Sequence, residues 1–501
     1  MRCIYSTLAL LYASTAVAAT TVDGLEPLSR HRKRSVESAC LAAQKALGND
    51  VVDLEPLNQT VVDNNWSVAC VREPFCIVSP VTAEQVSKAV KIISSHGVKF
   101  ATRSGGHSPN PGWASISKSG ILINMSGLNK VTVSSDNKIA RIGPGQRWGA
   151  VNSILETKGL AVVGGREPDV GVAGLILGGG YHHFSGKYGL AADNVANFEV
   201  VTADGCIKNA NAKENSDLFW ALKGGGSNFG IVTRYDLETI PVSKIWVMGI
   251  VYSPSQALEA IDAFTAWQKN GASDQLSTVT FLVGLDSVIV GLIYLEPAVK
   301  PEAFKPFYGL KPLQVLVPPT NVSYTFLDQI ANGGVFSTTR ERHDYRGVSS
   351  KIDADTTKAV YQYWLPKAQA AKASAGVNQT FAIQHVPKNL VDAGRKNGGN
   401  PLGLTAEDQL WWTTLVDWEH ATDDETARSA SIETTDYWKK LGKERGQHLP
   451  FIFMNDASRD QSPISTYGAN NINRLKQIAK KYDSKEFFQK QQNDGFLLRK
   501  V

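Results

Sequence analysis

The sequence is poor in cysteine, in methionine and in net charge. Its 501 residues include five cysteines and four methionines, and 52 basic against 47 acidic residues leave a formal charge of +5. Much of that excess lies in residues 30–34, so no basic stripe predicts nucleic-acid binding and no basic amphipathic helix predicts a membrane surface. The 43% hydrophobic content excludes a disordered, collagenous or multi-span membrane protein.

Several standard motifs are missing as well. Gly143-Pro-Gly145-Gln-Arg-Trp148 begins like the dinucleotide fingerprint but carries tryptophan where the last glycine belongs, and Gly178-Gly-Gly180 is followed by Tyr-His-His. The chain has no Walker A sequence, no nucleophile elbow and no His-Glu-x-x-His zinc site. We therefore expect no metal in the site.

What the sequence does have is length and clustered glycine. A chain of 501 residues predicts two or three lobes. Three glycine-rich loops, at 105–106, 178–180 and 224–226, let backbone N–H groups close on an anion because glycine has no Cβ. Three such loops indicate one elongated polyanionic ligand, such as a dinucleotide cofactor. The alternative is a set of tight turns in a β-rich lobe.

The first residues predict export. Arg2, the apolar stretch 4–17 and the small residues 16–19 together form a secretory signal peptide over residues 1–19, with a buried N-terminal helix as the alternative. Lys33-Arg34 resembles a dibasic processing site, which would make residues 20–34 a pro-segment; an exposed basic tail would look the same. We expect a secreted protein.

Sequons and cysteines agree with an oxidising compartment. The candidate glycosylation sites are Asn58, Asn65, Asn124, Asn321 and Asn378. Four cysteines remain outside the signal peptide, and they allow three pairings that the sequence does not decide: Cys40, Cys70, Cys76 and Cys206. At least one disulfide is expected outside the cell, and the pair put forward for testing is Cys40 with Cys76.

Residues 76–124 alternate between strand and helix signals. A strand at 76–80 precedes a capping box at Thr82–Gln85 and a helix with apolar residues at 86, 89, 90 and 93, which Gly97 ends. Further strands are expected at 99–102 and 120–124. The result is a β-α-β unit whose second strand is followed by a glycine-bearing loop at 103–108.

The pattern changes twice along the rest of the chain. Short strands are expected at 131–134, 139–142, 198–202 and 231–239, among frequent glycines. Residues 246–449 instead alternate long helices, such as 255–268 and 424–442, with strands such as 279–283 and 410–416, and we expect a separate α/β lobe there. The tail returns to a helix, with apolar residues at 472, 475, 478 and 482 on one face.

Four segments together resemble a known family. They are Arg103-Ser-Gly-Gly-His-Ser108, residues 170–180, residues 188–195 and residues 218–233. They resemble the FAD-binding domain of the p-cresol methylhydroxylase or vanillyl-alcohol-oxidase type. Within it they are most similar to berberine-bridge-enzyme-like oxidoreductases, especially the secreted fungal members of secondary metabolism. The resemblance covers residues 72–243, and the tail is similar to the family's C-terminal return to the FAD lobe.

The resemblance implies an α+β fold. A two-subdomain FAD-binding lobe would span residues 35–245 (core 72–243), an α/β substrate lobe with an antiparallel sheet would span 246–449, and residues 450–501 would return to the FAD lobe. It also implies a monomer that takes FAD, a small-molecule substrate and dioxygen. The implied cofactor-binding residues are Arg103, Ser104, Gly105, Gly106, His107, Ser108, Val170, Gly171, Gly174, Gly178, Gly179, Asn194, Gly230, Ile231 and Asn455.

His107 would, by the same resemblance, be bonded covalently to the flavin 8α-methyl carbon. Many relatives attach the flavin a second time through a cysteine, but Glu167 stands there in this chain, so a single link is expected. Pro109 replaces a substrate-side tyrosine of plant members, and Asn397-Gly-Gly-Asn-Pro401 lacks their carboxylate base. Val170 resembles the small residue that admits dioxygen to the flavin.

Three functions follow as hypotheses. The first is a secreted FAD-linked oxidase that transfers a hydride from a small secondary metabolite to flavin N5; the second is a secreted carbohydrate oxidase; the third is a flavin-free binding protein. Candidates for a catalytic base are Tyr345, Asp417, His385 and Asp456. Trp411, Trp412 and Trp418 alternate along a predicted strand, which favours core packing over an aromatic substrate platform.

Overall fold

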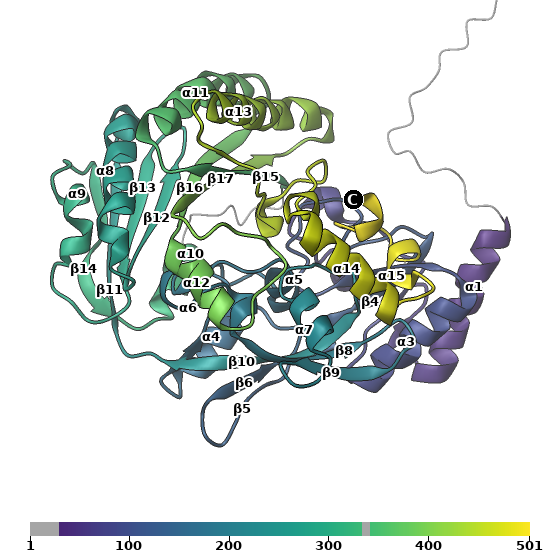
Figure 1. Cartoon of the computed structure of the whole chain (residues 1–501). Coiled ribbons are helices and arrows are strands. Elements are labelled where there is room, and N and C mark those ends of the chain that lie inside the picture. The colour runs from purple at the N-terminus through teal and green to yellow at the C-terminus, as the bar shows by residue number, and fades with distance from the viewer. Residues whose placement is uncertain (1–29, 333–340) are drawn as a thin grey trace, which may run out of the picture.

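A computed structural model of the chain describes residues 30–332 and 341–501 (Figure 1). The predicted signal peptide (1–19) and residues 20–29 of the predicted pro-segment lie outside the described residues. The backbone of residues 30–34 forms the start of helix α1 (Arg30–Leu47). Among the helices that the structure describes, none combines the length and the apolar character needed to cross a bilayer.

The first sheet has four strands in the order β1-β2-β4-β3. Strand β4 pairs in parallel with both β2 and β3, and helix α3 (Ala83–His96) makes the crossover. The predicted capping box is present in part: Thr82 Oγ1 accepts from the Gln85 amide, whereas Gln85 Oε1 accepts from the Val81 amide and not from the N-cap amide of Thr82. The strands are β1 (Val52–Asp53), β2 (Cys76–Val78), β3 (Lys99–Arg103) and β4 (Gly120–Asn124).

The second sheet is antiparallel, and its main path runs β5-β6-β10-β8-β9, with β7 paired to the end of β10. The predicted strands of this region are all present. The strands are β5 (Val131–Val133), β6 (Ile139–Ile142), β7 (Leu160–Val162), β8 (Val195–Val201), β9 (Ile207–Asn211) and β10 (Ile231–Pro241). Helices α2 (Gln59–Val62), α4 (Trp148–Glu156), α5 (Val172–Leu177), α6 (Ser185–Tyr188) and α7 (Ser216–Leu222) belong to the same part of the chain.

The third sheet has eight antiparallel strands in the order β14-β11-β13-β12-β16-β17-β15-β18, all drawn from residues 245–449. Its strands are β11 (Ile245–Tyr252), β12 (Ser277–Val283), β13 (Val288–Tyr294), β14 (Gln314–Val322), β15 (Arg342–Lys351), β16 (Asn378–Val386), β17 (Gln409–Trp418) and β18 (His448–Leu449). We call residues 245–449 the second lobe, and the described residues on either side of it the first lobe.

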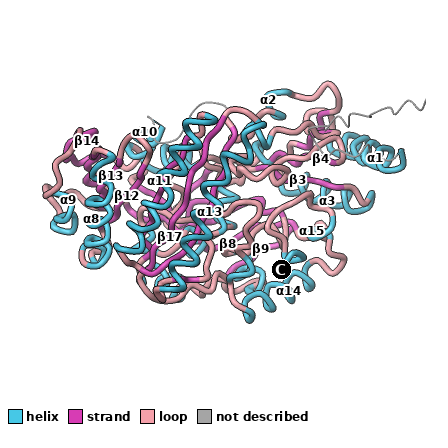
Figure 2. The backbone as a smooth tube through the Cα atoms, turned by 90° about the horizontal axis from the view of Figure 1, so that it is seen from above, coloured by secondary structure: helices cyan, strands magenta, loops and turns pink. Residues whose placement is uncertain are grey.

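Helices cover only the outer face of the third sheet. Helices α8 (Ala257–Lys269), α11 (Ala354–Ala375) and α13 (Asp424–Glu444) lie along it, as Figures 1 and 2 show. The core between them is aromatic: the Trp412 ring lies 5.6 Å from Trp438 and 5.5 Å from Phe381. Trp411, Trp412 and Trp418 are all buried, so core packing is confirmed. The remaining helices of this lobe are α9 (Lys305–Tyr308), α10 (Phe326–Asn332) and α12 (Lys388–Lys396).

The C-terminal segment packs on the first lobe (yellow in Figure 1). Helix α14 (Ala469–Tyr482) contacts α7, and the Tyr482 hydroxyl donates to Asp217 Oδ1 at 2.8 Å. Helix α15 (Phe487–Lys490) places the Phe487 ring 5.1 Å from Phe100 of β3. The structure is therefore the predicted α+β fold, with its antiparallel second-lobe sheet and its returning tail.

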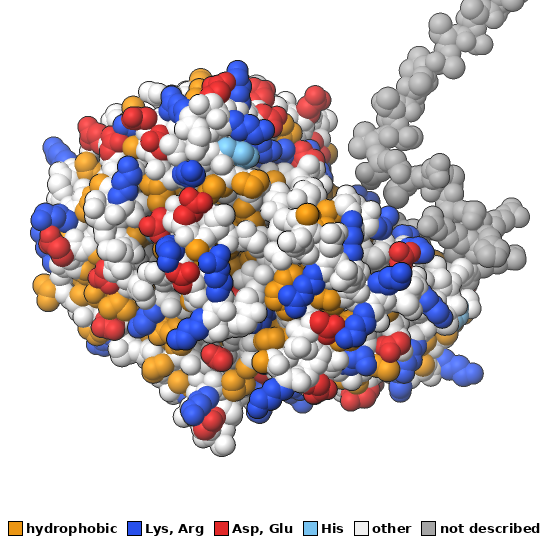
Figure 3. All heavy atoms as spheres, in the orientation of Figure 1, with side chains coloured by type: hydrophobic (Ala, Val, Ile, Leu, Met, Phe, Trp, Pro, Cys, Tyr) orange, Lys and Arg blue, Asp and Glu red, His pale blue; other side chains and the backbone are white. Residues whose placement is uncertain are grey.

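Acidic and basic side chains are interspersed on the face shown in Figure 3, without a patch of one sign.

The exposure of each sequon bears on the predicted glycosylation. Asn58, Asn321 and Asn378 are exposed and remain candidate glycosylation sites. Asn65 and Asn124 are 7% and 2% exposed in the folded chain, which disfavours a glycan at either position, and their glycosylation stays a prediction.

The predicted disulfide is confirmed. Cys40 of α1 is bonded to Cys76 of β2, with 6.1 Å between their Cα atoms and a sequence separation of 36. Of the other described cysteines, Cys70 is buried and Cys206 is exposed, and both are free. The bond ties the first described helix to the first sheet.

Replacing Cys40 and Cys76 with serine should lower the free energy of unfolding by about 2–4 kcal/mol, because the unfolded chain loses a constraint. Urea unfolding with and without a reducing agent measures this: reduction should bring the wild-type protein to the value of the double variant and leave that variant unchanged. Cys206→Ser, at an exposed free cysteine, is the control. Equal stability of the double variant and the wild type would contradict the prediction.

Candidate functional site

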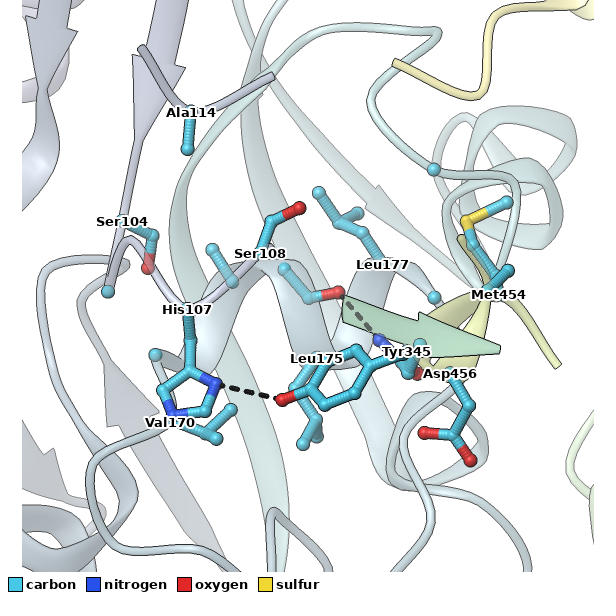
Figure 4. A pocket seen from close by; sticks show the side chains of 18 of the residues that line it. Ser104, His107, Ser108, Ala114, Val170, Leu175, Leu177, Tyr345, Met454 and Asp456 are labelled. Atoms are coloured by element: carbon cyan, nitrogen blue, oxygen red, sulfur yellow. Dashed lines mark hydrogen bonds between the residues drawn. The ribbon is translucent and has the colours of Figure 1, made fainter. Parts of the chain in front are cut away.

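A cavity of about 440 Å³ lies where the two lobes meet. The first lobe contributes the loop after β3, helix α5, the start of β10 and the tail around residues 453–457 and 492–496. The second lobe contributes side chains from the uncovered face of β12, β15, β16 and β17. Figure 4 shows the side chains of His107, Val170, Tyr345 and Asp456 converging on this space.

The loop after β3 forms one wall, and glycine permits its path. A Cβ on Gly105 would lie 2.5 Å from the Cα of Gly171, so the two glycine loops touch here backbone to backbone. Gly106 has φ +67°, a conformation that L side chains rarely adopt. The carbonyl of Gly106 accepts from the Trp66 amide outside the loop. In the part of the chain described, the Gly105 and Gly106 amides donate to no protein acceptor, which leaves them available for a ligand.

Arg103 anchors this loop from behind. Its side chain is 1% exposed, its Nη1 donates to Asn65 Oδ1 at 2.9 Å, and its Nη2 donates to the Val61 carbonyl. Arg103, which was predicted to bind the cofactor, does not line the cavity. Its guanidinium fixes the segment that leads to Trp66.

The His107 ring is held in an aromatic stack. Trp66 lies between His107 (ring centroids 4.3 Å apart, planes 9° apart) and His343 (3.8 Å, 3°). Behind the stack, Asp417 Oδ1 lies 2.6 Å from His343 Nδ1. A Glu341 carboxylate oxygen also lies within 4.8 Å of the bonding atoms of this pair. The hydrogen bond between His343 and Asp417 accounts for their closeness without a metal ion.

The His107 imidazole is uncharged at neutral pH. Removal from water lowers its pKa to about 3, and repulsion from Arg147 adds to the shift. The Tyr345 hydroxyl lies 3.4 Å from His107 Nδ1, as the dashed line in Figure 4 marks. A neutral imidazole with a free lone pair is the form that can act as a nucleophile.

Helix α5 and the tail form the opposite wall. Asn455 joins them, because its Oδ1 accepts from the Gly180 amide at 3.1 Å and its Nδ2 donates to the Gly174 carbonyl at 3.2 Å. A Cβ on Gly178 would lie 2.4 Å from Asn455. Gly174 has no atom within 4 Å of where a Cβ would be, so a side chain there would project into the cavity.

Most of the predicted cofactor-binding residues come together in this cavity. Gly179 and Asn194 do not line it; the Asn194 amide instead donates to the carbonyls of Tyr188 and Leu190 at 2.9 and 2.8 Å. The predicted residues that line the cavity are Ser104, Gly105, Gly106, His107, Ser108, Val170, Gly171, Gly174, Gly178, Gly230, Ile231 and Asn455.

The four candidate bases divide into two groups. Tyr345 and Asp456 line the cavity, whereas Asp417 is bonded to His343 behind Trp66. His385 also lies away from the lining, with its ring edge on Trp267. Burial raises the pKa of Tyr345 well above its ordinary value, so this hydroxyl stays protonated and serves as a donor.

Glu167 is the functional candidate that sequence reasoning missed. It was noted only as the residue that replaces a cysteine, yet its carboxyl lines the cavity. Burial raises its pKa to about 7, with Asp328 and Asp169 contributing and Arg166 opposing. Its position in the sequence, between two glycine loops of a suspected cofactor site, is the signal that could have predicted this role.

Comparison with known proteins shows the family of the chain. A family profile described as "FAD binding domain" matches residues 74–211, and one described as "Berberine and berberine like" matches residues 452–493. An FAD-dependent monooxygenase of Arthrobotrys oligospora is 37% identical over 91% of this chain and 89% of its own length. The bifunctional solanapyrone synthase of Alternaria solani is 35% identical over 86% of this chain and 83% of its own length.

The fold is shared with solved flavoenzymes. A gluco-oligosaccharide oxidase from Acremonium strictum, whose structure is described as revealing a novel flavinylation, superposes with a TM-score of 0.76. The superposition covers 90% of this chain and 96% of the oxidase at 20% sequence identity, a likeness of fold alone.

The residues of this chain fit an FAD molecule. The free amides of the loop after β3 suit a pyrophosphate, the space beside Gly174 admits an extended ligand, and the neutral His107 suits attachment to a flavin ring. The Tyr235 hydroxyl, which lines the cavity, is buried without a hydrogen-bond partner in the described structure. The chain belongs to the berberine-bridge-enzyme-like family of FAD-dependent oxidoreductases.

Proposed function

We propose that this protein is a secreted, monomeric oxidase that removes a hydride from a small, mainly apolar secondary metabolite and passes the electrons to dioxygen. The observation that carries the proposal is the meeting, in one mostly apolar cavity, of a glycine-walled cofactor cradle with a sheet face that presents both apolar and polar side chains. When bound, FAD supplies the hydride acceptor and the means of reducing dioxygen to hydrogen peroxide. The chain must hold that cofactor, place the substrate and handle its proton.

The sheet face above the cofactor cradle supports an apolar substrate. Leu282 of β12, Ala382 of β16 and Leu415 of β17 line the cavity on neighbouring strands. The tryptophans of β17 that would make a sugar platform are instead buried in the core. These observations favour a metabolite with an aromatic or polyketide-like body over an oligosaccharide.

Carbohydrate oxidation stays as the second candidate, because the Acremonium strictum oxidase shares the fold. Release of peroxide on addition of glucose, cellobiose or lactose would favour it. The third hypothesis, a flavin-free binding protein, requires the purified protein to be colourless.

Glu167 is the proposed proton acceptor. Oxidation of an alcohol or a phenol needs a base for the O–H proton while the C–H hydride departs. Glu167 lines the cavity, and its pKa of about 7 makes the carboxylate available at neutral pH, close to the optimum for a general base. Tyr345 is the proposed donor that orients the same oxygen, since its hydroxyl stays protonated.

The proposal of secretion rests on the segment 1–19, on the Cys40–Cys76 disulfide and on the exposed sequons at Asn58, Asn321 and Asn378. Val170 lines the cavity as a medium-sized apolar side chain, which supports access of dioxygen.

Acid precipitation should leave the flavin in the protein pellet, because His107 forms the single covalent link. In His107→Ala all of the flavin should appear in the supernatant, measured by its absorbance. His183→Ala removes another imidazole that lines the cavity and should keep its flavin in the pellet. Flavin retained in the His107 variant would mean that another residue forms a bond.

Reoxidation should separate an oxidase from a dehydrogenase without any substrate. The flavin of the purified protein is reduced anaerobically with dithionite and mixed with air-saturated buffer. We expect the yellow colour to return with about one hydrogen peroxide per flavin, detected with a peroxidase-coupled dye. Val170→Leu should slow the recovery by narrowing the path of dioxygen. Recovery that stays slow in the wild type would indicate a dehydrogenase.

The Glu167 carboxyl should be visible in the flavin spectrum. Because its folded pKa is raised to about 7, the group is neutral at pH 5 and charged at pH 9, and the new charge should shift the flavin absorbance. A pH titration of the holoenzyme should show a transition near pH 7 that Glu167→Gln lacks. Asp169→Asn, at an exposed neighbour, should keep it. An unchanged transition in the Glu167 variant would remove this residue as the proton acceptor.

A further inference from the structure

Arg166 presents a cation to the cavity with few partners of its own. Its Nη2 donates to Gln384 Oε1, and its guanidinium carbon lies 4.8 Å from the centre of the Tyr181 ring. Between residues 30–332 and 341–501, no carboxylate oxygen lies within 4.0 Å of its nitrogens. Most of its five N–H donors are therefore left for a molecule in the cavity.

Other arginines near this lobe interface are paired. Arg342 lies 2.6 Å from Asp424, Arg346 lies 2.6 Å from Asp460, and Arg428 lies 2.7 Å from Asp344. Arg103 and Arg147, which also lie near the cavity, bond instead to carbonyl and amide oxygens. Arg166 is half-buried and donates to Gln384 alone among the described residues, so its remaining N–H groups are open to a ligand in the cavity.

The two nearby carboxyl groups do not supply that partner. Gln384 lies between Asp456 and Arg166. Its Nε2 donates to Asp456 Oδ2 at 2.7 Å, and its Oε1 accepts from Arg166 Nη2. Glu167 follows Arg166 directly in sequence, and burial favours the neutral form of both acids. The positive charge of Arg166 is therefore only partly compensated.

The guanidinium is also fixed in direction. The Tyr181 hydroxyl donates to the His385 carbonyl at 2.6 Å, which holds the tyrosine ring as a platform under Arg166. Gln384 fixes one edge of the guanidinium from β16. A planar guanidinium that is fixed on its face and on one edge can donate two parallel N–H bonds to two oxygens in its own plane.

We propose that Arg166 is the substrate-binding cation and that the substrates are small, mainly apolar organic oxyanions. The shared chemistry is a negative charge on oxygen, as in a carboxylate or in a phenolate or enolate. The apolar body of the substrate would lie against Leu282, Ala382 and Leu415. This inference rests on the proposed function and narrows its substrate class.

Binding of small probes to the holoenzyme tests this inference. The probes are benzoate, pentafluorophenolate and the neutral benzamide, each added at pH 6, where the Glu167 carboxyl is mostly protonated, while the flavin absorbance is followed, with calorimetry as a second readout. The wild type should bind at least one oxyanion about tenfold or more tightly than benzamide, because a charged hydrogen bond is worth about 1.5–3 kcal/mol. Which oxyanion binds distinguishes a carboxylate from a phenolate or enolate substrate.

Three variants complete the experiment. Arg166→Gln should weaken oxyanion binding about tenfold to hundredfold and leave benzamide binding unchanged. Arg166→Lys should fall between it and the wild type, because the charge is kept and the fork is lost. Arg395→Gln removes an exposed arginine of α12 and should bind like the wild type. Thermal unfolding and flavin content of each variant show that it is folded.

Two results would overturn the inference: benzamide bound by the wild type as tightly as both oxyanions, or no loss of oxyanion affinity in a folded Arg166→Gln protein. Failure of the proposed function looks different. A colourless protein, or one whose reduced flavin does not return electrons to dioxygen, would remove the oxidase while leaving probe binding to Arg166 measurable by calorimetry.

Discussion

The stack of His107, Trp66 and His343 is the contact on which the arrangement of the site depends. His107 belongs to the loop after β3, whereas His343 belongs to β15 of the second lobe, and Trp66 joins them with nearly parallel rings. The segment around Trp66 is bonded on both sides: the Trp66 amide donates to the Gly106 carbonyl of the loop after β3, and the Ser67 hydroxyl accepts from the His343 amide of β15. The lobes are thus locked at the residue proposed to hold the flavin.

One physical cause, exclusion of water from this junction, explains the charge states around the cavity. The same desolvation lowers the pKa of His107 and raises the pKa values of Glu167 and Asp456, because each group avoids its charged form. A neutral imidazole and a carboxyl that titrates near neutrality are what attachment of a flavin and removal of a proton require. Arg166 adds a permanent cation to the same cavity, which is why an anionic ligand is proposed for it.

Local signals predicted the fold and one wall of the site well. The capping box of α3, the strands of both first-lobe sheets and the loop 103–108 all have short-range causes: a cap, an alternation, a glycine where no Cβ fits. Arg103 was misplaced because a residue beside the loop still belongs to β3, and its side chain points behind the loop. Asn65 and Asn124 satisfy the sequon pattern, but burial is set by tertiary packing that the pattern does not contain.

The side chains that face the substrate could not be predicted from the sequence, because they depend on strand register. The same dependence limits what a shared fold implies about the substrate. On β16, Gln384 faces the cavity and His385 faces α8, so a shift of one residue exchanges a site residue for a core residue. The register that decides between them is set by pairing with β17, the next strand along the chain, and with β12, which lies far away in sequence. A relative with the same eight strands can therefore present sugar-binding side chains on a face where this chain presents Leu282, Ala382 and Leu415. Substrate choice in this fold follows from the alternate positions of a few strands, and Arg166 at their edge is the residue proposed to select among ligands there.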